Sequence, residues 1–258
     1  MLLQAMARVI AVCNQKGGVG KTTTSVNLGA YLASMGKYVL LVDLDSQANA
    51  TIGLGLDVHP GAQTVYHALV SDVNPATAVH KSKMYGYDVL PATQALAGAT
   101  VELVGMQERE FRLRRTINHL RNNYDYILID CPPSLGLLTV NALTAADKVL
   151  IPVQCEYYAL EGLGQLMRSI ELVRGGLNPN LSVLGVVLTM YDKRNQLARQ
   201  VVNEVVHNFP GRVFEAIVPR VVSAAEAPSY GKTILEHDPE SKAGDAYRLL
   251  AAAIVRLG

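Results

Sequence analysis

The sequence predicts an α/β fold in which helices cover both faces of one doubly wound, mostly parallel sheet. Apolar segments of strand length, rich in β-branched residues, alternate with helical patterns along the chain. These short segments are apolar throughout, as expected where helices bury both faces of a parallel sheet. No Pro-, Gly- or Ser-rich linker interrupts the series, so we expect one domain over residues 1–258.

Each expected element follows from the length and period of its apolar residues. Short apolar runs predict strands over residues 8–13, 38–43, 126–130, 148–153, 183–189 and 213–218. Longer segments with helical spacing predict helices over residues 22–35, 102–121, 135–146, 158–174, 197–207 and 242–256. Strands joined by helices of this length imply right-handed crossover connections.

The composition fits a large buried core and excludes several classes of protein. Half of the 258 residues are hydrophobic and 17% are charged, which is too apolar for a disordered chain. The net charge of +1 argues against a polybasic or acidic tail, although it leaves room for a local basic patch. The chain has no Trp, so a stacking platform for single-stranded nucleic acid is not expected. No uncharged apolar run of about 18 residues exists, so no membrane insertion is expected.

The cysteines and the N-terminus indicate a cytosolic protein. Cys13, Cys131 and Cys155 are far apart and have apolar neighbours, so structural zinc and a disulfide framework are disfavoured and packed, reduced thiols are expected. The opening MLLQAMAR is too short for a signal peptide, and Met6 is an alternative start.

Two expected strands end in aspartates, Asp43 and Asp130. In open α/β sheets, ligands bind at the carboxyl ends of the strands. A single carboxylate there could simply cap the next turn, but two of them beside a glycine-rich loop favour a functional site.

That loop follows the first strand and reads NQKGGVGKTT over residues 14–23. Its three glycines allow a tight turn whose N–H groups converge, and the helix that begins near Thr22 adds its N-terminal dipole. Lys21 supplies a cation for the β- and γ-phosphates, and the Thr22 hydroxyl can ligate Mg²⁺. This pattern predicts a phosphate-binding loop.

One position departs from the usual GxxxxGK[ST] pattern, because Gln15 replaces the first glycine and Lys16 follows it. The segment KGGVGKTT resembles the deviant Walker A motif of the ParA/MinD group of P-loop ATPases. The resemblance implies a P-loop NTPase fold, ATP and Mg²⁺ as cofactors, and a homodimer in which Lys16 reaches the nucleotide of the other subunit. Such a charge completes the transition-state clamp only when the partner arrives.

Two acidic motifs are similar to motifs of the same group. Residues 43–47 (DLDSQ) resemble its DxDPQ segment, with Ser46 in place of proline. The resemblance assigns Asp45 to positioning the attacking water and Asp43 to supporting the strand end and the metal shell. Residues 130–134 (DCPPS) resemble the Walker B and switch II segment, in which Asp130 would hold Mg²⁺ through water.

Four further segments resemble Soj-type partition proteins, the short ParA forms: residues 156–162 (EYYALEG), 189–192 (TMYD), 218–220 (VPR) and 225–232 (AEAPSYGK). The resemblance places Met190, Pro219 and Arg220 near the adenine. The implied catalytic residues are Lys16, Lys21 and Asp45. The implied ATP-binding residues are Lys16, Gly17, Gly18, Val19, Gly20, Lys21, Thr22, Thr23, Met190, Pro219 and Arg220.

The implied function is ATP-dependent chromosome partition. In that family ATP drives sandwich dimerisation and non-specific binding to double-stranded DNA, and a ParB-type partner stimulates hydrolysis and release, which segregates the chromosome origin. The protein would be cytoplasmic and nucleoid-associated. Arg194 and Lys232 match DNA-contacting positions, whereas Ser223 stands where relatives have an arginine.

A second basic stretch, residues 109–121, is interpreted differently. Glu108 precedes Arg112 by four residues, and Glu110 precedes Arg114 by four. These are favourable i,i+4 pairs on a helix, so we expect a solvated helix face instead of a nucleic-acid site.

Other functions share the loop. A MinD-like division-site ATPase needs an amphipathic C-terminal helix, whereas residues 245–258 are apolar nearly all round and are expected to pack on the core. A nitrogenase-reductase-type carrier needs two cysteine ligands per subunit, and no second cysteine is expected beside Cys131. A cargo-positioning ATPase for a plasmid or protein organelle would use identical chemistry. A small-molecule ligase or kinase would transfer phosphate to an acceptor other than water.

Overall fold

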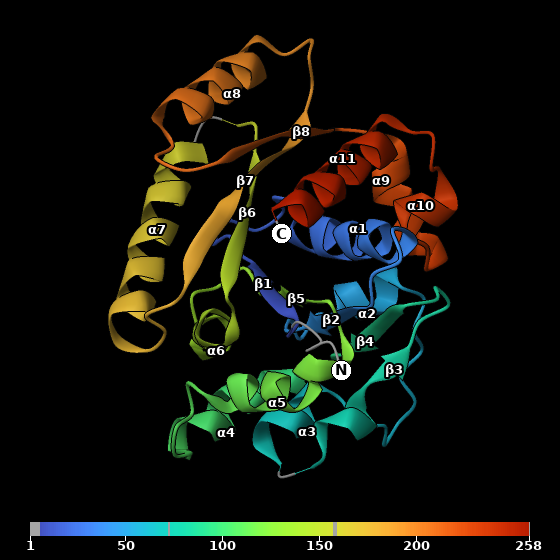
Figure 1. Cartoon of the computed structure of the whole chain (residues 1–258), viewed down its shortest axis with the longest axis vertical. Coiled ribbons are helices and arrows are strands. Elements are labelled where there is room, and N and C mark those ends of the chain that lie inside the picture. Colours follow the sequence, from blue (N-terminus) through green and yellow to red (C-terminus); the bar gives the residue numbers. More distant parts are fainter. Residues whose placement is uncertain (1–5, 72, 157–158, 258) are drawn as a thin grey trace.

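The centre of the molecule is an eight-stranded sheet with the strand order β3-β4-β2-β5-β1-β6-β7-β8 (Figure 1). The computed structural model describes residues 6–71, 73–156 and 159–257. Its strands are β1 (Arg8–Val12), β2 (Val39–Asp43), β3 (His80–Lys81), β4 (Tyr87–Leu90), β5 (Tyr126–Asp130), β6 (Lys148–Gln154), β7 (Ser182–Tyr191) and β8 (Val213–Pro219). All pairings are parallel except that of β3 with β4, which confirms the expected mostly parallel sheet.

Helices follow most strands and return the chain to the opposite end of the sheet. They are α1 (Lys21–Ser34), α2 (Asn49–Gly53), α3 (Val65–Val70), α4 (Leu96–Glu102), α5 (Arg112–Leu120), α6 (Leu137–Ala145), α7 (Ala159–Gly176), α8 (Gln196–Asn208), α9 (Val222–Glu226), α10 (Ile234–His237) and α11 (Lys242–Arg256). Short 3₁₀ turns are η1 (Pro75–Ala78), η2 (Leu103–Gly105), η3 (Arg121–Asn123) and η4 (Ala227–Tyr230).

Two hydrophobic cores lie on opposite faces of the sheet. In β1, Val9 and Ala11 belong to the core shared with α5 to α8, whereas Ile10 and Val12 belong to the core shared with α1 and α11. Successive side chains of a strand point to opposite faces, so an all-apolar strand must be covered on both sides. Figure 1 shows α1 and α11 on one side of the sheet and α5, α6 and α7 on the other.

The expected helix over residues 102–121 is wrong. The chain leaves α4 through η2, passes a turn in which Glu108 has a φ of 50°, and begins α5 at Arg112. The break lets α4 pack on α3 and α5 pack on α6. The expected i,i+4 pairs fail for the same reason, since Glu108 pairs with Arg115 and Glu110 pairs with Arg109.

Other differences are smaller. The sequence interpretation missed β3, β4 and the helices α2, α3, α4, α9 and α10. Apart from the broken helix over residues 102–121, the expected elements differ from the structure only at their ends. The expected helix start at Tyr158 and the residues before Met6 lie outside the described residues. Within the described ranges, no helix is long and apolar enough to cross a membrane.

Candidate functional site

The phosphate-binding loop connects the end of β1 to the start of α1, at the carboxyl edge of the sheet. The buried Asn14 side chain fixes its entry, since its Nδ2 donates to the Pro152 carbonyl at 2.7 Å and its Oδ1 accepts from the Lys16 N–H at 3.0 Å. Gly20 precedes α1 with a φ of 85°, a conformation that favours glycine. A Cβ built on Gly17 or Gly18 would meet nothing within 4 Å, so this side of the loop is open to a ligand.

Lys21 is buried at the base of the loop. Its Nζ donates to the Lys16 carbonyl at 3.1 Å, across the turn that the phosphates would occupy. Burial lowers the pKa of Lys21, and nearby carboxylates, first Asp130 and then Asp45, oppose that shift. An ammonium group placed this way gains most when a phosphate replaces the carbonyl as its partner.

Thr22 and Asp130 form the oxygen-rich part of the site. The Thr22 hydroxyl donates to Asp130 Oδ2 at 2.7 Å, and the Ser25 hydroxyl donates to Asp130 Oδ1 at 2.8 Å. Asp130 is fully buried, and burial together with the neighbouring Asp43 raises its pKa to about 7. A hydroxyl and a carboxylate are ligands that suit Mg²⁺, which keeps several waters of its own, so these residues fit the expected metal.

Asp43 and Asp130 lie directly opposite each other on the adjacent strands β2 and β5, as expected from the sequence. Asp43 is also fully buried, and burial raises its pKa to about 6. Its Oδ2 accepts from the Thr51 N–H at 2.8 Å and from the Thr51 hydroxyl at 2.7 Å, while its Oδ1 accepts from the Asp45 N–H at 3.2 Å. Asp43 therefore holds the loop that carries Asp45.

Asp45 itself is half-buried in the turn that follows β2. Its Oδ1 accepts from the Gln47 N–H at 3.0 Å, which closes a tight turn after β2. It is close enough to Lys21 to oppose the lowering of that lysine's pKa. The structure thus brings Asp45, Lys21 and Asp130 together from three separate segments.

Lys16 points to Glu156, at the end of β6. Its Nζ is 3.3 Å from Glu156 Oε2, while the other oxygen, Oε1, accepts from Gln154 Nε2 at 2.6 Å and from Arg220 Nη2 at 3.4 Å. The carboxylate of Glu156 therefore sits between Lys16 of the loop and Arg220 at the end of β8. Tyr157 and Tyr158, which belong to the same motif, lie outside the described residues.

The three residues expected near the adenine line one cavity of about 240 Å³ beside the phosphate loop. Met190, Pro219 and Arg220 share its wall with Gly20, Thr23, Thr189, Val218, Val221, Ala224, Ala225 and Tyr247. The wall is tied to the phosphate loop, since the Thr189 hydroxyl donates to the Val19 carbonyl at 2.8 Å. A mostly apolar slot next to a phosphate cradle suits a nucleotide base.

The two residues expected to contact DNA lie in different surroundings. Arg194 lines a cavity of about 370 Å³ together with Lys193, Arg220 and Lys242. Its guanidinium makes two hydrogen bonds to Asp192, at 2.9 and 3.1 Å, which lower the pKa of Asp192 to about 2. Lys242 was missed by the sequence interpretation because it begins α11, far from Arg194 in the chain.

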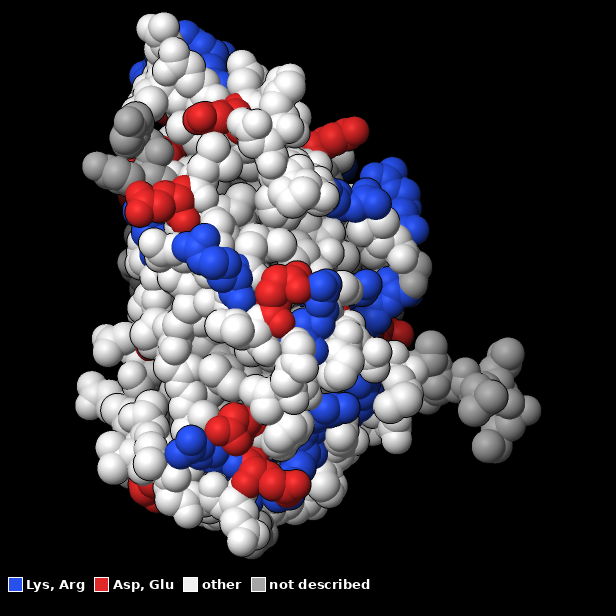
Figure 2. Space-filling model, turned by 90° about the vertical axis from the view of Figure 1, so that its left-hand side faces the viewer, with Lys and Arg blue, Asp and Glu red and all other residues white. Residues whose placement is uncertain are grey.

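Lys232 lines a separate cavity of about 280 Å³ that includes Thr22, Thr23, Asn49 and Ile52. Lys232 and Arg194 therefore line two different cavities. On the side of the molecule that carries α7 and α8, basic and acidic side chains are intermingled (Figure 2), as in the ion pair of Arg174 with Glu171.

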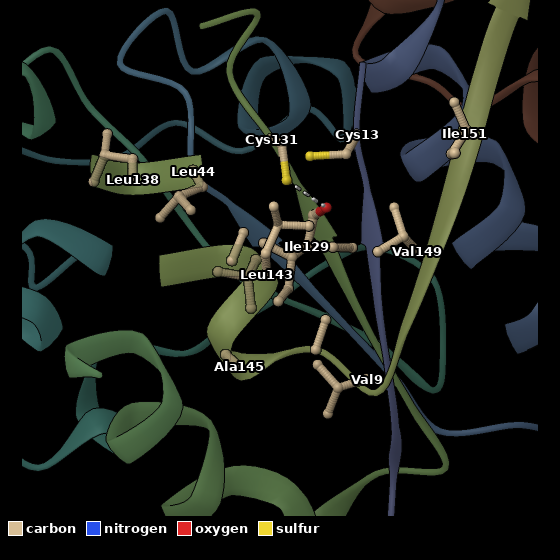
Figure 3. Packing of buried hydrophobic residues seen from close by; sticks show 14 of the residues in the cluster. Val9, Cys13, Leu44, Ile129, Cys131, Leu138, Leu143, Ala145, Val149 and Ile151 are labelled. Carbon is tan, nitrogen blue, oxygen red and sulfur yellow. Dashed lines mark hydrogen bonds between the residues drawn. The ribbon is translucent and has the colours of Figure 1, made fainter. Parts of the chain in front are cut away.

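Cys13 and Cys131 lie next to each other at the ends of β1 and β5 (Figure 3). The expectation that no second cysteine accompanies Cys131 is therefore wrong. Both side chains are nevertheless 1% exposed, and burial raises the pKa of the Cys131 thiol well above its usual value. A cluster that bridges two subunits needs thiolates at the surface, so these packed thiols do not suit it.

The last helix packs on the core as expected. Its buried face includes Ala246, Tyr247, Leu250 and Ile254, and it contacts β8 and α1. Ser241 caps its start by accepting from the Gly244 N–H at 3.1 Å. The core therefore covers the main apolar face of this helix, while Leu249 on the other side stays exposed.

Comparisons with known proteins agree with this geometry. A family model described as an AAA domain matches residues 7–183. The chain is 53% identical to the sporulation initiation inhibitor protein Soj of Bacillus subtilis, over 98% of this chain and 100% of that protein. It is 51% identical to the chromosome-partitioning ATPase Soj of Thermus thermophilus, over 98% of each. A solved structure of cobyrinic acid a,c-diamide synthase from Mycobacterium smegmatis with bound ADP and magnesium superposes with a TM-score of 0.86 at 41% identity, covering 97% of this chain and 95% of that one.

Proposed function

Because the chain belongs to the Soj/ParA family of chromosome-partitioning ATPases, we propose that it is a Mg²⁺-dependent ATP hydrolase whose nucleotide state controls DNA binding and chromosome segregation. The observation that supports this most is the meeting of Lys16, Lys21, Asp45 and Asp130 around one open phosphate loop. We also propose that residues 1–258 form a single domain, which the one continuous eight-stranded sheet supports.

ATP binds with its phosphates in the loop and its base in the cavity lined by Met190, Pro219 and Arg220. Lys21 and the loop N–H groups hold the β- and γ-phosphates. Thr22 and Asp130 hold Mg²⁺, Asp130 through water, and the bound ion neutralises charge on the phosphate oxygens. Arrival of the ion favours the ionised form of Asp130, which burial alone disfavours.

Hydrolysis transfers the γ-phosphoryl group to water. Asp45 orients the water in line with the bond between the γ-phosphorus and the bridging oxygen, which breaks to leave ADP and phosphate. Lys16 leaves Glu156 and stabilises the charge on the nucleotide of the other subunit in a sandwich dimer. Two variants test these roles: Asp45→Ala should form an ATP-locked dimer, and Lys16→Ala should bind ATP without dimerising. Normal hydrolysis by Asp45→Ala, or normal dimerisation by Lys16→Ala, would refute the corresponding role.

DNA binding follows dimerisation, because two weak basic surfaces then act together. We assign the contacts to Arg194 and Lys232, and we add Lys193 and Lys242 because they share a cavity wall with Arg194. Release of Arg194 from Asp192 frees its guanidinium for a phosphate. A ParB-type partner stimulates hydrolysis and thereby release, and the protein works in the cytoplasm on the nucleoid.

The deciding experiment measures DNA binding of the wild-type protein and Asp45→Ala with ATP, with ADP and without nucleotide, over a salt series. ATP-only binding that is retained by Asp45→Ala and weakens steeply with salt supports the proposal. Equal binding in all three nucleotide states, or binding that ignores salt, would refute it. Nucleotide-dependent binding to liposomes without DNA binding would instead favour a MinD-like role.

The likeness to the diamide synthase suggests a second candidate, an ATP-dependent amide synthase. Such an enzyme passes the γ-phosphoryl group to a carboxylate substrate before an amine attacks. Phosphate release in the absence of any organic acceptor distinguishes the two. Release equal to the ATP consumed supports hydrolysis, whereas a strict requirement for an added carboxylate would support the synthase.

A further inference from the structure

Two loops from distant parts of the chain touch backbone to backbone at Gly55 and Gly231. A Cβ built on Gly55 would lie 2.7 Å from the Gly231 carbonyl oxygen, and one built on Gly231 would lie 2.6 Å from the Gly55 Cα. Their φ angles are 66° and 59°, a region that favours glycine. Neither position can accept a side chain without moving one backbone away from the other.

On one side of this contact lies the loop that carries Asp45. Asp43 joins that loop to α2 through its carboxylate. The carboxylate accepts from the Asp45 N–H at 3.2 Å, and it accepts from the N–H and the hydroxyl of Thr51 in α2 at 2.8 and 2.7 Å. Gly55 is held at the end of α2 by a 2.8 Å hydrogen bond from its N–H to the Ile52 carbonyl. A shift of the Asp45 loop is therefore carried through α2 to Gly55.

On the other side lies the segment formed by residues 221–232. It begins at the adenine-side cavity, which Val221 lines, and it ends at Lys232. The Gly231 N–H donates to the Pro228 carbonyl at 3.0 Å and the Lys232 N–H donates to the Ala227 carbonyl at 3.1 Å, so η4 and Lys232 move as one turn. This segment thus touches the nucleotide site at its base end and the α2 loop at its other end.

α2 and η4 lie next to each other. A cavity of about 280 Å³, lined by Asn49, Ile52 and Pro228 among others, lies between these elements and α1. A Cβ on Gly53 would lie 4.0 Å from the Pro228 side chain, an ordinary contact, whereas the Gly55–Gly231 approach leaves no free space. α2 and η4 also contact each other directly, and the Gly55–Gly231 approach is the point at which neither backbone has room to move towards the other.

We propose that the Gly55–Gly231 contact transmits the nucleotide state of the Asp45 loop to residues 221–232 and so sets the DNA affinity at Lys232. This inference rests on the proposed function, because it requires ATP-dependent DNA binding. Coupling between two sites is reciprocal, so DNA must raise the affinity for ATP by the factor by which ATP raises the affinity for DNA.

The test compares Gly231→Ala with the matched control Gly61→Ala. Gly61 has a φ of 88° and nothing within 4 Å of a built Cβ, so its variant carries the backbone strain of a positive φ without the clash. The affinity for a short duplex is measured with ATP and with ADP by fluorescence anisotropy, and ATP-driven dimerisation is measured by sedimentation. We expect the ATP/ADP affinity ratio to fall at least about fivefold in Gly231→Ala, the lower end of ordinary couplings, with dimerisation retained and the control unchanged.

The results separate a failure of the Gly55–Gly231 coupling from a failure of the proposed function. A Gly231→Ala protein that dimerises and keeps the wild-type ratio overturns the proposal. A wild-type protein that never binds DNA with ATP refutes the proposed function, independently of this contact. If Gly231→Ala does not fold, hydrogen exchange of the wild-type chain replaces it: a non-hydrolysable ATP analogue should slow exchange at the Gly231 and Lys232 amides without DNA present. Unchanged exchange at these amides overturns the coupling.

Discussion

Thr51 provides the sharpest test of how the Asp45 loop is held. Thr51 is 2% exposed, and its hydroxyl donates to Asp43 Oδ2 at 2.7 Å. The hydroxyl oxygen of Thr51 also accepts from the Ala92 N–H at 3.1 Å. Thr51→Val keeps the shape of the side chain and removes both interactions. Loss of a hydrogen bond to a carboxylate costs about 1.5–3 kcal/mol, and an unpaired buried N–H costs about 1–3 kcal/mol. The free energy of unfolding should therefore fall by about 3–5 kcal/mol.

The assay is thermal and urea unfolding of the nucleotide-free protein, with Thr51→Ser as the matched control. Serine keeps the hydroxyl and loses one methyl group, at a cost of about 1 kcal/mol. For a chain of this length about 1 kcal/mol corresponds to roughly 2–4 °C, so the valine variant should melt roughly 10 °C below the wild type and well below the serine variant. Equal losses in the two variants would refute the reasoning, since methyl packing and not the hydroxyl would then hold α2.

The effect of Thr51→Val should also depend on pH. Burial raises the pKa of Asp43 from 3.8 to about 6. The contribution of this group to the free energy of unfolding is therefore fully present below pH 4 and is lost as the pH rises through about 6. The Thr51 hydrogen bonds oppose the shift, because they favour the carboxylate over the acid. Without the hydroxyl the pKa of Asp43 rises further, and the deficit of Thr51→Val should be larger at pH 8 than at pH 5.

Further predictions concern packing, thiol reactivity and DNA binding. Gly29→Ala should strongly lower the free energy of unfolding measured in denaturant titrations, because a Cβ there would clash with the Tyr87 hydroxyl. Gly175 lies in an exposed turn of α7 with free space around a built Cβ. Gly175→Ala should therefore raise the free energy of unfolding by about 0.5–1 kcal/mol in the same titrations. Native protein should not react with a thiol-specific disulfide reagent at pH 8, because burial raises the pKa of Cys155 to about 12 and the other two thiols are also buried. Unfolded protein should react at all three cysteines. A fast reaction of the native protein would contradict this prediction. Arg194→Ala should reduce the slope of log affinity against log salt for DNA by about 1 per protomer, and an unchanged slope would remove Arg194 from the contact.

The parts of the fold that the sequence predicted are those with a strong local pattern. Each of the six expected strands occurs in the structure with small shifts at its ends, and most are apolar runs buried on both faces; β8 alternates, with Glu215 exposed. The sequence did not predict β4, because Asp88 interrupts its apolar run. The structure accommodates this buried carboxylate by pairing it with Lys81 at 2.7 Å and with the Tyr124 hydroxyl at 2.9 Å. Neither partner is visible in the local sequence.

The break between α4 and α5 was invisible for a different reason. Residues 102–121 have helical composition, and a single Gly105 does not exclude a helix. Packing decides the outcome, because α4 contacts α3 while α5 contacts both α3 and α6. Tertiary contacts therefore override a local preference that is weak at each residue.

In the site, sequence reasoning located the residues that a motif carries and missed those that support them. Asp43 and Asp130 were expected on neighbouring strands, and they are register partners. Thr51 and Ser25, which supply hydrogen bonds to these carboxylates, belong to no motif in the sequence. The catalytic, ATP-binding and DNA-binding roles themselves remain predictions that the variants above address.

The position of β5 has a consequence for how the chain is made. β1 and β2 never pair with each other; both pair with β5, which lies between them. Residues 126–130 leave the ribosome long after β2 has emerged. Until then β1 lacks its partner β5, and β2 can pair only with β4, so the nascent chain carries apolar strands with open edges, a state prone to aggregation. Insertion of β5 joins β1 to β2 and aligns Asp43 with Asp130 in the same event, so synthesis past this strand both ends the period of exposure and forms the edge that we propose binds Mg²⁺.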